Sequence, residues 1–246
     1  MDIYTKQVQF ELQIWKKGIL KEPSYTDLLA KSIQNRVNNI IPEKVPQAIT
    51  VTIQKMVQLV LFGSSYSTSL PLVDQSLIYR EAHVKRQIEI YKKTASAEGA
   101  ITGAGGILLG LADFPILLGI KIKFLFEVSA LYGYDVKDYR ERLYILYVFQ
   151  LAFSSRKRQR EVFEYLSKWN TYQKTLPSNV EEFDWRTFQQ EYRDYIDLAK
   201  MAQLIPVIGA AVGAIANYKL IGKLGLTAMN CYRMREEGFN ISEIES

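Results

Sequence analysis

The chain has 246 residues, of which 48% are hydrophobic and 23% charged, and its formal net charge is +5. A mean hydropathy of −0.08 excludes a multi-spanning transporter. A single cysteine, Cys231, and a single histidine, His83, exclude an intramolecular disulfide and a zinc site built from several cysteines or histidines. The positive charge favours acidic partners such as anionic lipid.

The N-terminal segment fits two patterns. Val8, Leu12, Trp15 and Ile19 match one face of a helix, whereas the alternation of apolar residues from Val8 to Ile14 matches a strand. The glutamine, glutamate and lysine residues between them favour the helix. The opening MDIYTKQVQF lacks a basic start followed by an unbroken apolar run, so we expect no secretory signal and a largely cytoplasmic protein.

Further helices are predicted before the first clear loop. One spans 28–41 and is stopped by Pro42, and the next begins at Pro46 and ends at Gly63. The segment GSSYSTSLP, residues 63–71, is typical of a loop. A long charged helix is then expected over 73–97.

The stretch from Glu98 to Lys123 is the most informative in the chain, because between its charged ends, Glu98 and Lys121, it is apolar and contains one ionisable residue, Asp113. We interpret it as helical, with Pro115 interrupting the hydrogen-bond ladder, and as half of a close-packed helical hairpin or core seam rather than a simple lipid-exposed span. On that helix the small residues and the single carboxylate share a face, which predicts a seam for a second helix. The members of this seam are Gly99, Gly103, Gly106, Gly110 and Asp113.

A second segment rich in small residues begins near Pro206. Gly209 and Gly213 recur there at helical spacing, with Asn217 beside them. If the two glycine-rich segments face each other, Asp113 and Asn217 meet as the polar end of a tightly packed helix pair. Both membrane contact and a tightly packed soluble core fit this pattern.

Basic residues follow two of the apolar segments. Lys121 and Lys123 end the first glycine-rich stretch, and a denser group follows the predicted helix over 136–153. These cations can contact anionic lipid headgroups, although the start of a solvated helix also explains the denser group. That group consists of Arg156, Lys157, Arg158 and Arg160.

Established catalytic and nucleotide-binding motifs are missing from the sequence. The glycines after residue 102 do not follow a predicted strand and lack the third glycine of a dinucleotide loop, and no Gly-Lys-Ser/Thr triplet is present. No nucleophile elbow, zinc-protease or kinase motif occurs, and no nucleic-acid-binding module is visible. We therefore predict no catalytic, cofactor or metal residue, and we do not expect a nucleic-acid partner.

Three segments resemble the EcsC family: EGAITGAGGILLGLADFP (98–115), YGYDVKDYRERLYIL (132–146) and FDWRTFQQEYRDYIDLAKMAQLIPVIGAAVGAIANYKL (183–220). The resemblance implies a mostly helical bacterial protein encoded beside the two subunits of the Ecs ABC transporter. It implies no reaction, because the family has no agreed catalytic residues. The resemblance extends to individual positions. These are the glycines, Asp113 and Pro115 of the first segment, and Pro206, Gly209, Gly213 and Asn217 of the third.

Together these observations predict an all-α multi-helix bundle with two glycine-rich, tightly packed segments. We expect one domain over 1–246, with a family core at 98–220 and N-terminal helices at 1–70 that match the family loosely. The expected function is that of a non-enzymatic accessory protein of an ABC transporter at the inner face of the membrane. The alternative is a peptidase or lipid-directed hydrolase that uses Asp113 and neighbouring acids.

Overall fold

The computed structural model describes the backbone of residues 2–21, 44–62, 70–104, 106–154, 156–184, 186, 188 and 210–236. Within these ranges, side chains are not described for 44–49, 61–62, 101–113, 157 and 210–213. The expected helix over 28–41, and most of the segment 183–209, therefore lie outside the described residues.

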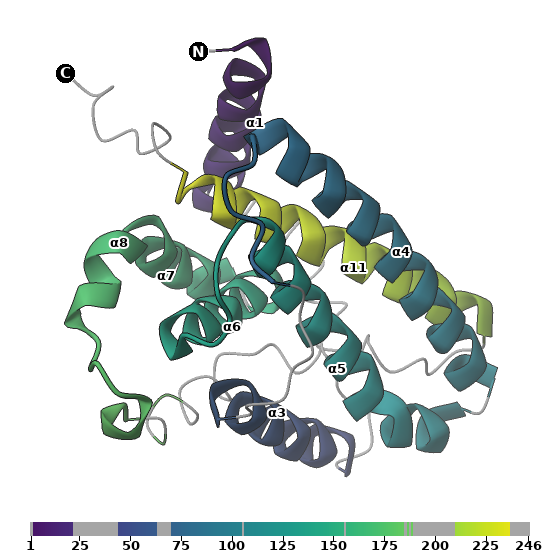
Figure 1. Cartoon of the computed structure of the whole chain (residues 1–246). Coiled ribbons are helices and arrows are strands. Elements are labelled where there is room, and N and C mark those ends of the chain that lie inside the picture. Colours follow the sequence, from purple (N-terminus) through teal and green to yellow (C-terminus); the bar gives the residue numbers. More distant parts are fainter. Residues whose placement is uncertain are drawn as a thin grey trace.

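The described part of the chain forms helices and no β-strand, which confirms the prediction of an all-α multi-helix bundle (Figure 1). The α-helices are α1 (Ile3–Leu20), α3 (Lys44–Phe62), α4 (Leu77–Ala104), α5 (Gly106–Leu131), α6 (Tyr139–Phe153), α7 (Arg156–Ser167), α8 (Trp169–Tyr172) and α11 (Ala210–Arg233). Two short 3₁₀ helices, η1 (Gln173–Thr175) and η2 (Val180–Glu182), follow α8.

Helix α6 forms the centre of the core, because it is buried on every side. Every residue from Leu143 to Phe153 is buried, and the helix contacts α3, α5, α7 and α11. Asp138 caps its N-terminus by accepting a hydrogen bond from the Arg140 backbone N–H at 2.9 Å. A helix that is apolar all round is stable in water only when other helices enclose it.

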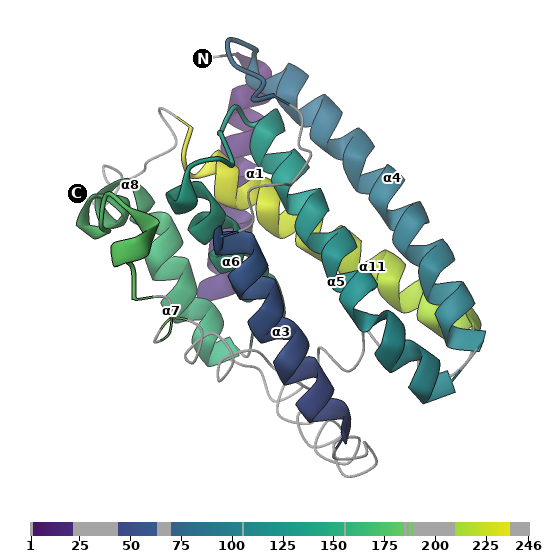
Figure 2. The same cartoon turned by 60° about the horizontal axis from the view of Figure 1, so that its bottom comes forward.

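Helices α4, α5 and α11 form a layer on one side of α6 (Figures 1 and 2). The chain reverses between Ala104 and Gly106, so that α4 and α5 form a hairpin, and α11 packs along α4. The stretch from Glu98 to Lys123 is therefore divided between α4 and α5, and the interruption expected at Pro115 is wrong, because α5 continues through that residue. Helix α5 begins at Gly106, a residue type that disfavours a continuous helix.

Two glycines of α11 bring its backbone close to α4. A Cβ atom added to Gly225 would lie 2.6 Å from Cγ1 of Ile88, and one added to Gly222 would lie 3.0 Å from Cε of Lys92. The pairs Gly225/Ile88 and Gly222/Lys92 also define an antiparallel register. Extending this register places Gly99, which is buried, opposite residue 214 or 215 of α11.

Most other described boundaries agree with the sequence, but α4 begins four residues later and ends seven residues later than the helix expected over 73–97. Helix α1 resolves the N-terminal ambiguity in favour of a helix, and α3 ends at Phe62, one residue before the expected stop. Gly133 follows α5 with a φ of +90°, a conformation that glycine adopts without strain, and its N–H donates to the Ala130 carbonyl at 2.9 Å.

We predict opposite effects for two glycine-to-alanine substitutions. Gly225→Ala forces a methyl group against Ile88 and should lower the free energy of unfolding by about 1–3 kcal/mol. Gly119→Ala is the matched control, because no atom lies within 4 Å of its added Cβ; it should raise stability by about 0.5–1 kcal/mol through helix propensity. Urea unfolding of both variants measures these changes, and equal stabilisation by both would contradict the close approach at Gly225.

Candidate functional site

A buried ion pair joins α4 to the end of α11. Arg233 donates from Nε and Nη2 to the two carboxylate oxygens of Glu81, each at 2.6 Å, and both residues are almost completely buried. Burial alone would lower the pKa of the Arg233 guanidinium, but the hydrogen bonds and charge of Glu81 outweigh burial and raise that pKa. The pair is therefore a charged, bidentate contact.

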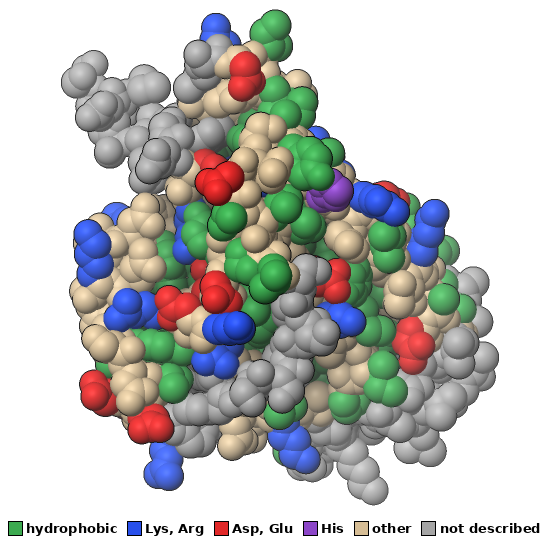
Figure 3. Space-filling view, viewed as in Figure 1, with side chains coloured by type: hydrophobic (Ala, Val, Ile, Leu, Met, Phe, Trp, Pro, Cys, Tyr) green, Lys and Arg blue, Asp and Glu red, His purple; other side chains and the backbone are tan. Residues whose placement is uncertain are grey.

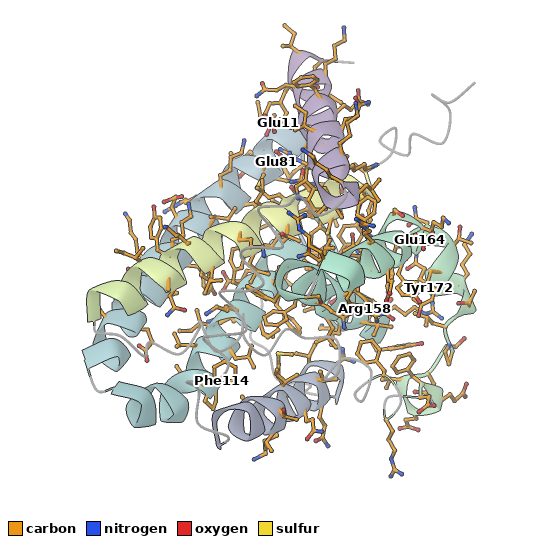
Figure 4. All side chains as sticks on the ribbon, turned by 180° about the vertical axis from the view of Figure 1, so that it is seen from behind. Glu11, Glu81, Phe114, Arg158, Glu164 and Tyr172 are labelled. Atoms are coloured by element: carbon orange, nitrogen blue, oxygen red, sulfur yellow. The ribbon has the colours of Figure 1, made fainter. Side chains whose placement is uncertain are left out.

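Helix α1 and the turn after α5 contribute further groups to this pair. The Tyr4 hydroxyl donates to Glu81 at 2.6 Å, and the Tyr132 hydroxyl donates to it at 3.3 Å. Glu11 of α1 accepts a hydrogen bond from Nη1 of Arg233 at 3.1 Å. Figure 4 shows Glu11 and Glu81 labelled at the place where α1 meets α4. Three helices and the turn after α5 thus meet at one charge pair.

A second buried pair lies on the other side of the same segment. Arg235, in the turn after α11, donates to Glu141 of α6 at 2.6 Å, and its guanidinium lies 3.6 Å from the ring centre of Tyr134. Ser129 and Tyr232 also donate to the Glu141 carboxylate, at 2.8 and 2.6 Å. This carboxylate is therefore held by hydrogen bonds from α5 and α11 as well as by charge.

The described reactive side chains are poorly placed for acid–base or nucleophilic chemistry. Both buried glutamates are ion-paired, and burial raises the pKa of the Cys231 thiol, which disfavours the thiolate. The His83 ring packs on Tyr79 with centroids 4.6 Å apart. Among the described residues, no three His, Cys, Asp or Glu side chains are grouped so that they could hold a metal ion.

Lys121 of α5 is completely buried, although we expected it at a lipid surface. Its ammonium donates to the Leu117 carbonyl at 3.2 Å and to Oδ1 of Asn217 on α11 at 3.1 Å. In this position it cannot reach a headgroup, so that expectation is wrong. Burial without a carboxylate in either hydrogen bond lowers the pKa of Lys121 to about 7.

The other predicted cations fall into two groups. Lys123 and Arg156 are exposed, and the described part of Lys157 is limited to its backbone in α7. Arg158 is mostly buried and pairs with Glu161 at 2.9 Å. Two of these arginines also tie α7 to the end of α1, since Arg156 donates to the Gly18 carbonyl at 3.3 Å and Arg160 donates to the Lys21 carbonyl at 3.4 Å.

The predicted polar contact between Asp113 and Asn217 stays a prediction, because the Asp113 side chain is not described. Asn217 is buried at the interface of α5 and α11, where Lys121 is its hydrogen-bond donor. Pro206 and Gly209 lie outside the described residues. The remaining seam positions are divided between helices: Gly99 and Gly103 on α4, Gly106, Gly110 and the exposed Pro115 on α5, and Gly213 on α11.

Sequence reasoning missed the residues that form the buried pairs. A usable signal for Glu81 was its place in an otherwise apolar stripe of α4, which consists of Leu77, Val84, Ile88, Tyr91 and Ala95. A charge in such a stripe predicts a buried partner. Its partner was not recognisable, because Arg233 lies 152 positions further along the chain.

The sequence also did not lead us to predict the exposed apolar side chains on the outer surface of α1. Ile3, Phe10 and Ile14 are exposed on this helix, where hydrophobic side chains form part of the upper surface in Figure 3. The same helix buries Val8 and Leu12, so it has apolar residues on two sides. Among the helices that the structure describes, none is both long and apolar enough to cross a bilayer.

Comparison with known proteins confirms the resemblance found in the sequence. The model of the EcsC protein family matches residues 6–236. Protein EcsC of Bacillus subtilis (strain 168) is 46% identical over 222 residues, which cover 90% of this chain and 91% of that protein. The uncharacterized protein YdbA of the same strain is 32% identical over 154 residues, 61% of this chain and 56% of YdbA. No solved structure matches the chain.

We predict that loss of the buried charge on Glu81 strongly destabilises the fold. Glu81→Gln leaves the Arg233 guanidinium without its bidentate partner, and the free energy of unfolding should fall by about 3–5 kcal/mol. Glu164→Gln is the matched control, because its 3.7 Å pair with Lys168 has both side chains 73% exposed; its effect should stay within about 1 kcal/mol. Similar losses in the two variants would show that the buried pair has no special role.

We also predict that Lys121 makes stability depend on pH. The pKa of Lys121 is about 7 in the folded protein, below the 10.5 of an exposed lysine, so above pH 7 the unfolded chain binds more protons and stability rises with pH. For this one proton, the free energy of unfolding rises by at most about 1.4 kcal/mol per pH unit. Lys121→Met should flatten the profile of the unfolding free energy between pH 7 and about 8.5. Above this range the cysteine thiol of the unfolded chain also loses its proton, which changes the slope for a separate reason.

Lys123→Met is the control for this prediction, because Lys123 lies on the same helix and is exposed. It should leave the pH profile of the unfolding free energy unchanged. A profile of Lys121→Met that is parallel to that of the unmodified protein would contradict the lowered pKa.

Proposed function

This chain belongs to the EcsC protein family, and on that premise we propose that it is a non-enzymatic accessory protein of an ABC transporter, held at the inner face of the cell membrane. The family resemblance supports the transporter link, because it implies a protein encoded beside the two subunits of the Ecs transporter. The family match and the identity to Bacillus subtilis EcsC extend over most of the chain. The proposed role is to assist or regulate the transporter.

The observation that carries this proposal is the contrast between the interior and the surface. Inside, Glu81 and Glu141 are held by arginines and tyrosines, and each serves to join helices. On the surface, large apolar side chains are exposed on several helices, including α1, α4 and α11. Exposed apolar groups on a chain with a net charge of +5 support binding to another surface better than they support chemistry.

The alternative, a hydrolase centred on Asp113, receives no comparable support. A general acid or base has to reach substrate with a free proton site. The buried acids on the described side chains are committed to arginine, and Cys231 is a buried thiol with a raised pKa. The accessory role therefore accounts for more of the described residues.

Cell fractionation tests the proposal. We expect the protein in the membrane fraction, with partial release by a high-salt wash, because electrostatic contacts weaken as salt shortens the Debye length. Membranes solubilised in mild detergent should also yield the ATPase and permease subunits of an ABC transporter together with the tagged protein. Recovery entirely in the cytosol would contradict the membrane part, and absence of both transporter subunits would contradict the accessory role.

A further inference from the structure

The outward surface of α1 combines apolar side chains in a single row. Ile3, Phe10 and Ile14 are 87%, 64% and 56% exposed, and their spacings of seven and four residues place them on one face of the helix. Single exposed apolar residues are common on proteins, but a row of three along one helix marks a contact surface. This row is called the outer face of α1 below.

Lysines occupy the same face. Lys6 and Lys17 are exposed and lie within one turn of the apolar row, and the exposed Lys21 follows the end of the helix. The two acidic residues of this segment make hydrogen bonds within the fold: Asp2 caps the helix start by accepting from the Thr5 N–H, and Glu11, whose side chain is 44% exposed, accepts from Arg233. The outer face thus combines apolar side chains with neighbouring lysines, and the charge of the nearby Glu11 is paired with Arg233.

The fold does not need this face, because the opposite side of α1 attaches the helix to the bundle. Val8 and Leu12 are 1% exposed, the Trp15 ring packs on Phe163 with centroids 5.9 Å apart, and Tyr4 donates to Glu81. Figure 1 shows α1 at one end of the bundle, beside the start of α4. Contact by the outer face thus requires no rearrangement of the core.

We propose that the outer face of α1 lies flat on an anionic lipid bilayer and is the membrane-binding element of the protein. This inference rests on the proposed function, which it makes specific. A helix of 18 residues is about 27 Å long, so the row can follow the bilayer surface along its whole length. Phenylalanine and isoleucine enter the headgroup and acyl boundary, while lysines remain among the phosphates.

The mixture of apolar and cationic side chains on the outer face of α1 fits an anionic bilayer better than it fits other surfaces. Apolar and cationic side chains lie along the same helix face, and an anionic bilayer offers apolar depth and negative charge in the same plane. Basic residues on α7 extend the charge at the C-terminal end of the helix, since Arg156 and Arg160 bond to the carbonyls of Gly18 and Lys21. This end therefore adds to the attraction for acidic headgroups.

Vesicle binding by the full chain tests the apolar part. The protein is sedimented with phosphatidylcholine vesicles that contain or lack phosphatidylserine. Phe10→Ser/Ile14→Ser should weaken binding to the anionic vesicles by about tenfold or more, because two buried apolar side chains are lost. The control Ile116→Ser/Leu226→Ser removes two side chains of similar exposure, 53% and 54%, from α5 and α11 and should bind like the unmodified protein.

The same assay tests the charged part. Lys6→Gln/Lys17→Gln should weaken binding by about fivefold for each lysine, and only on vesicles that contain phosphatidylserine. Lys93→Gln/Lys219→Gln is the control, because both lysines are exposed on other helices. All four replaced side chains are exposed, so circular dichroism and thermal unfolding should show an unchanged fold.

The outcomes separate this inference from the proposed function. If the unmodified protein binds anionic vesicles and both α1 variants bind equally well, the α1 inference is wrong and the membrane proposal stands. If the unmodified protein binds no vesicle, both fail. If Phe10→Ser/Ile14→Ser instead converts a dimer to a monomer and leaves vesicle binding unchanged, the outer face contacts a second copy, and the α1 inference is overturned.

Discussion

The position of α11 is governed by the need to neutralise two buried carboxylates from a single short segment. Arg233 ends the helix and pairs with Glu81 of α4, and Arg235 follows two residues later and pairs with Glu141 of α6. A buried charge that loses its partner costs several kcal/mol. Sliding α11 by one turn along α4 would separate both pairs at once, so we infer that these pairs fix the register of the helix layer.

The close approach of α11 to α4 depends on the same register. Gly225 faces Ile88 and Gly222 faces Lys92, and a bulkier residue opposite Ile88 would push the two helices apart. The layer is different at its other end, where Lys121 meets the amide of Asn217. Arg233 and Asn217 are 16 residues apart on one helix, or about 24 Å. One end of the layer thus has paired charges, and the other end has a lysine with a pKa of about 7.

The sequence predicted the helices well because their apolar periodicity and end signals are local. The stop before Gly63 and the turn at Gly133 followed from glycine chemistry alone. The reversal after Ala104 was missed, because the apolar composition continues through it and periodicity does not report a change of direction. Partners such as Glu81 and Arg233 were not predictable, since nothing local connects residues so far apart in the chain.

The buried state of Cys231 has a practical consequence for experiments on this protein. It is the single cysteine of the chain, it is completely enclosed at the end of α11, and burial raises the pKa of its thiol. Maleimide and nitroxide reagents react with exposed thiolates, so this thiol should stay unlabelled in the native fold. A cysteine introduced at an exposed position would then carry the only probe, and spin-label or fluorescence measurements of depth and distance need no cysteine-free background.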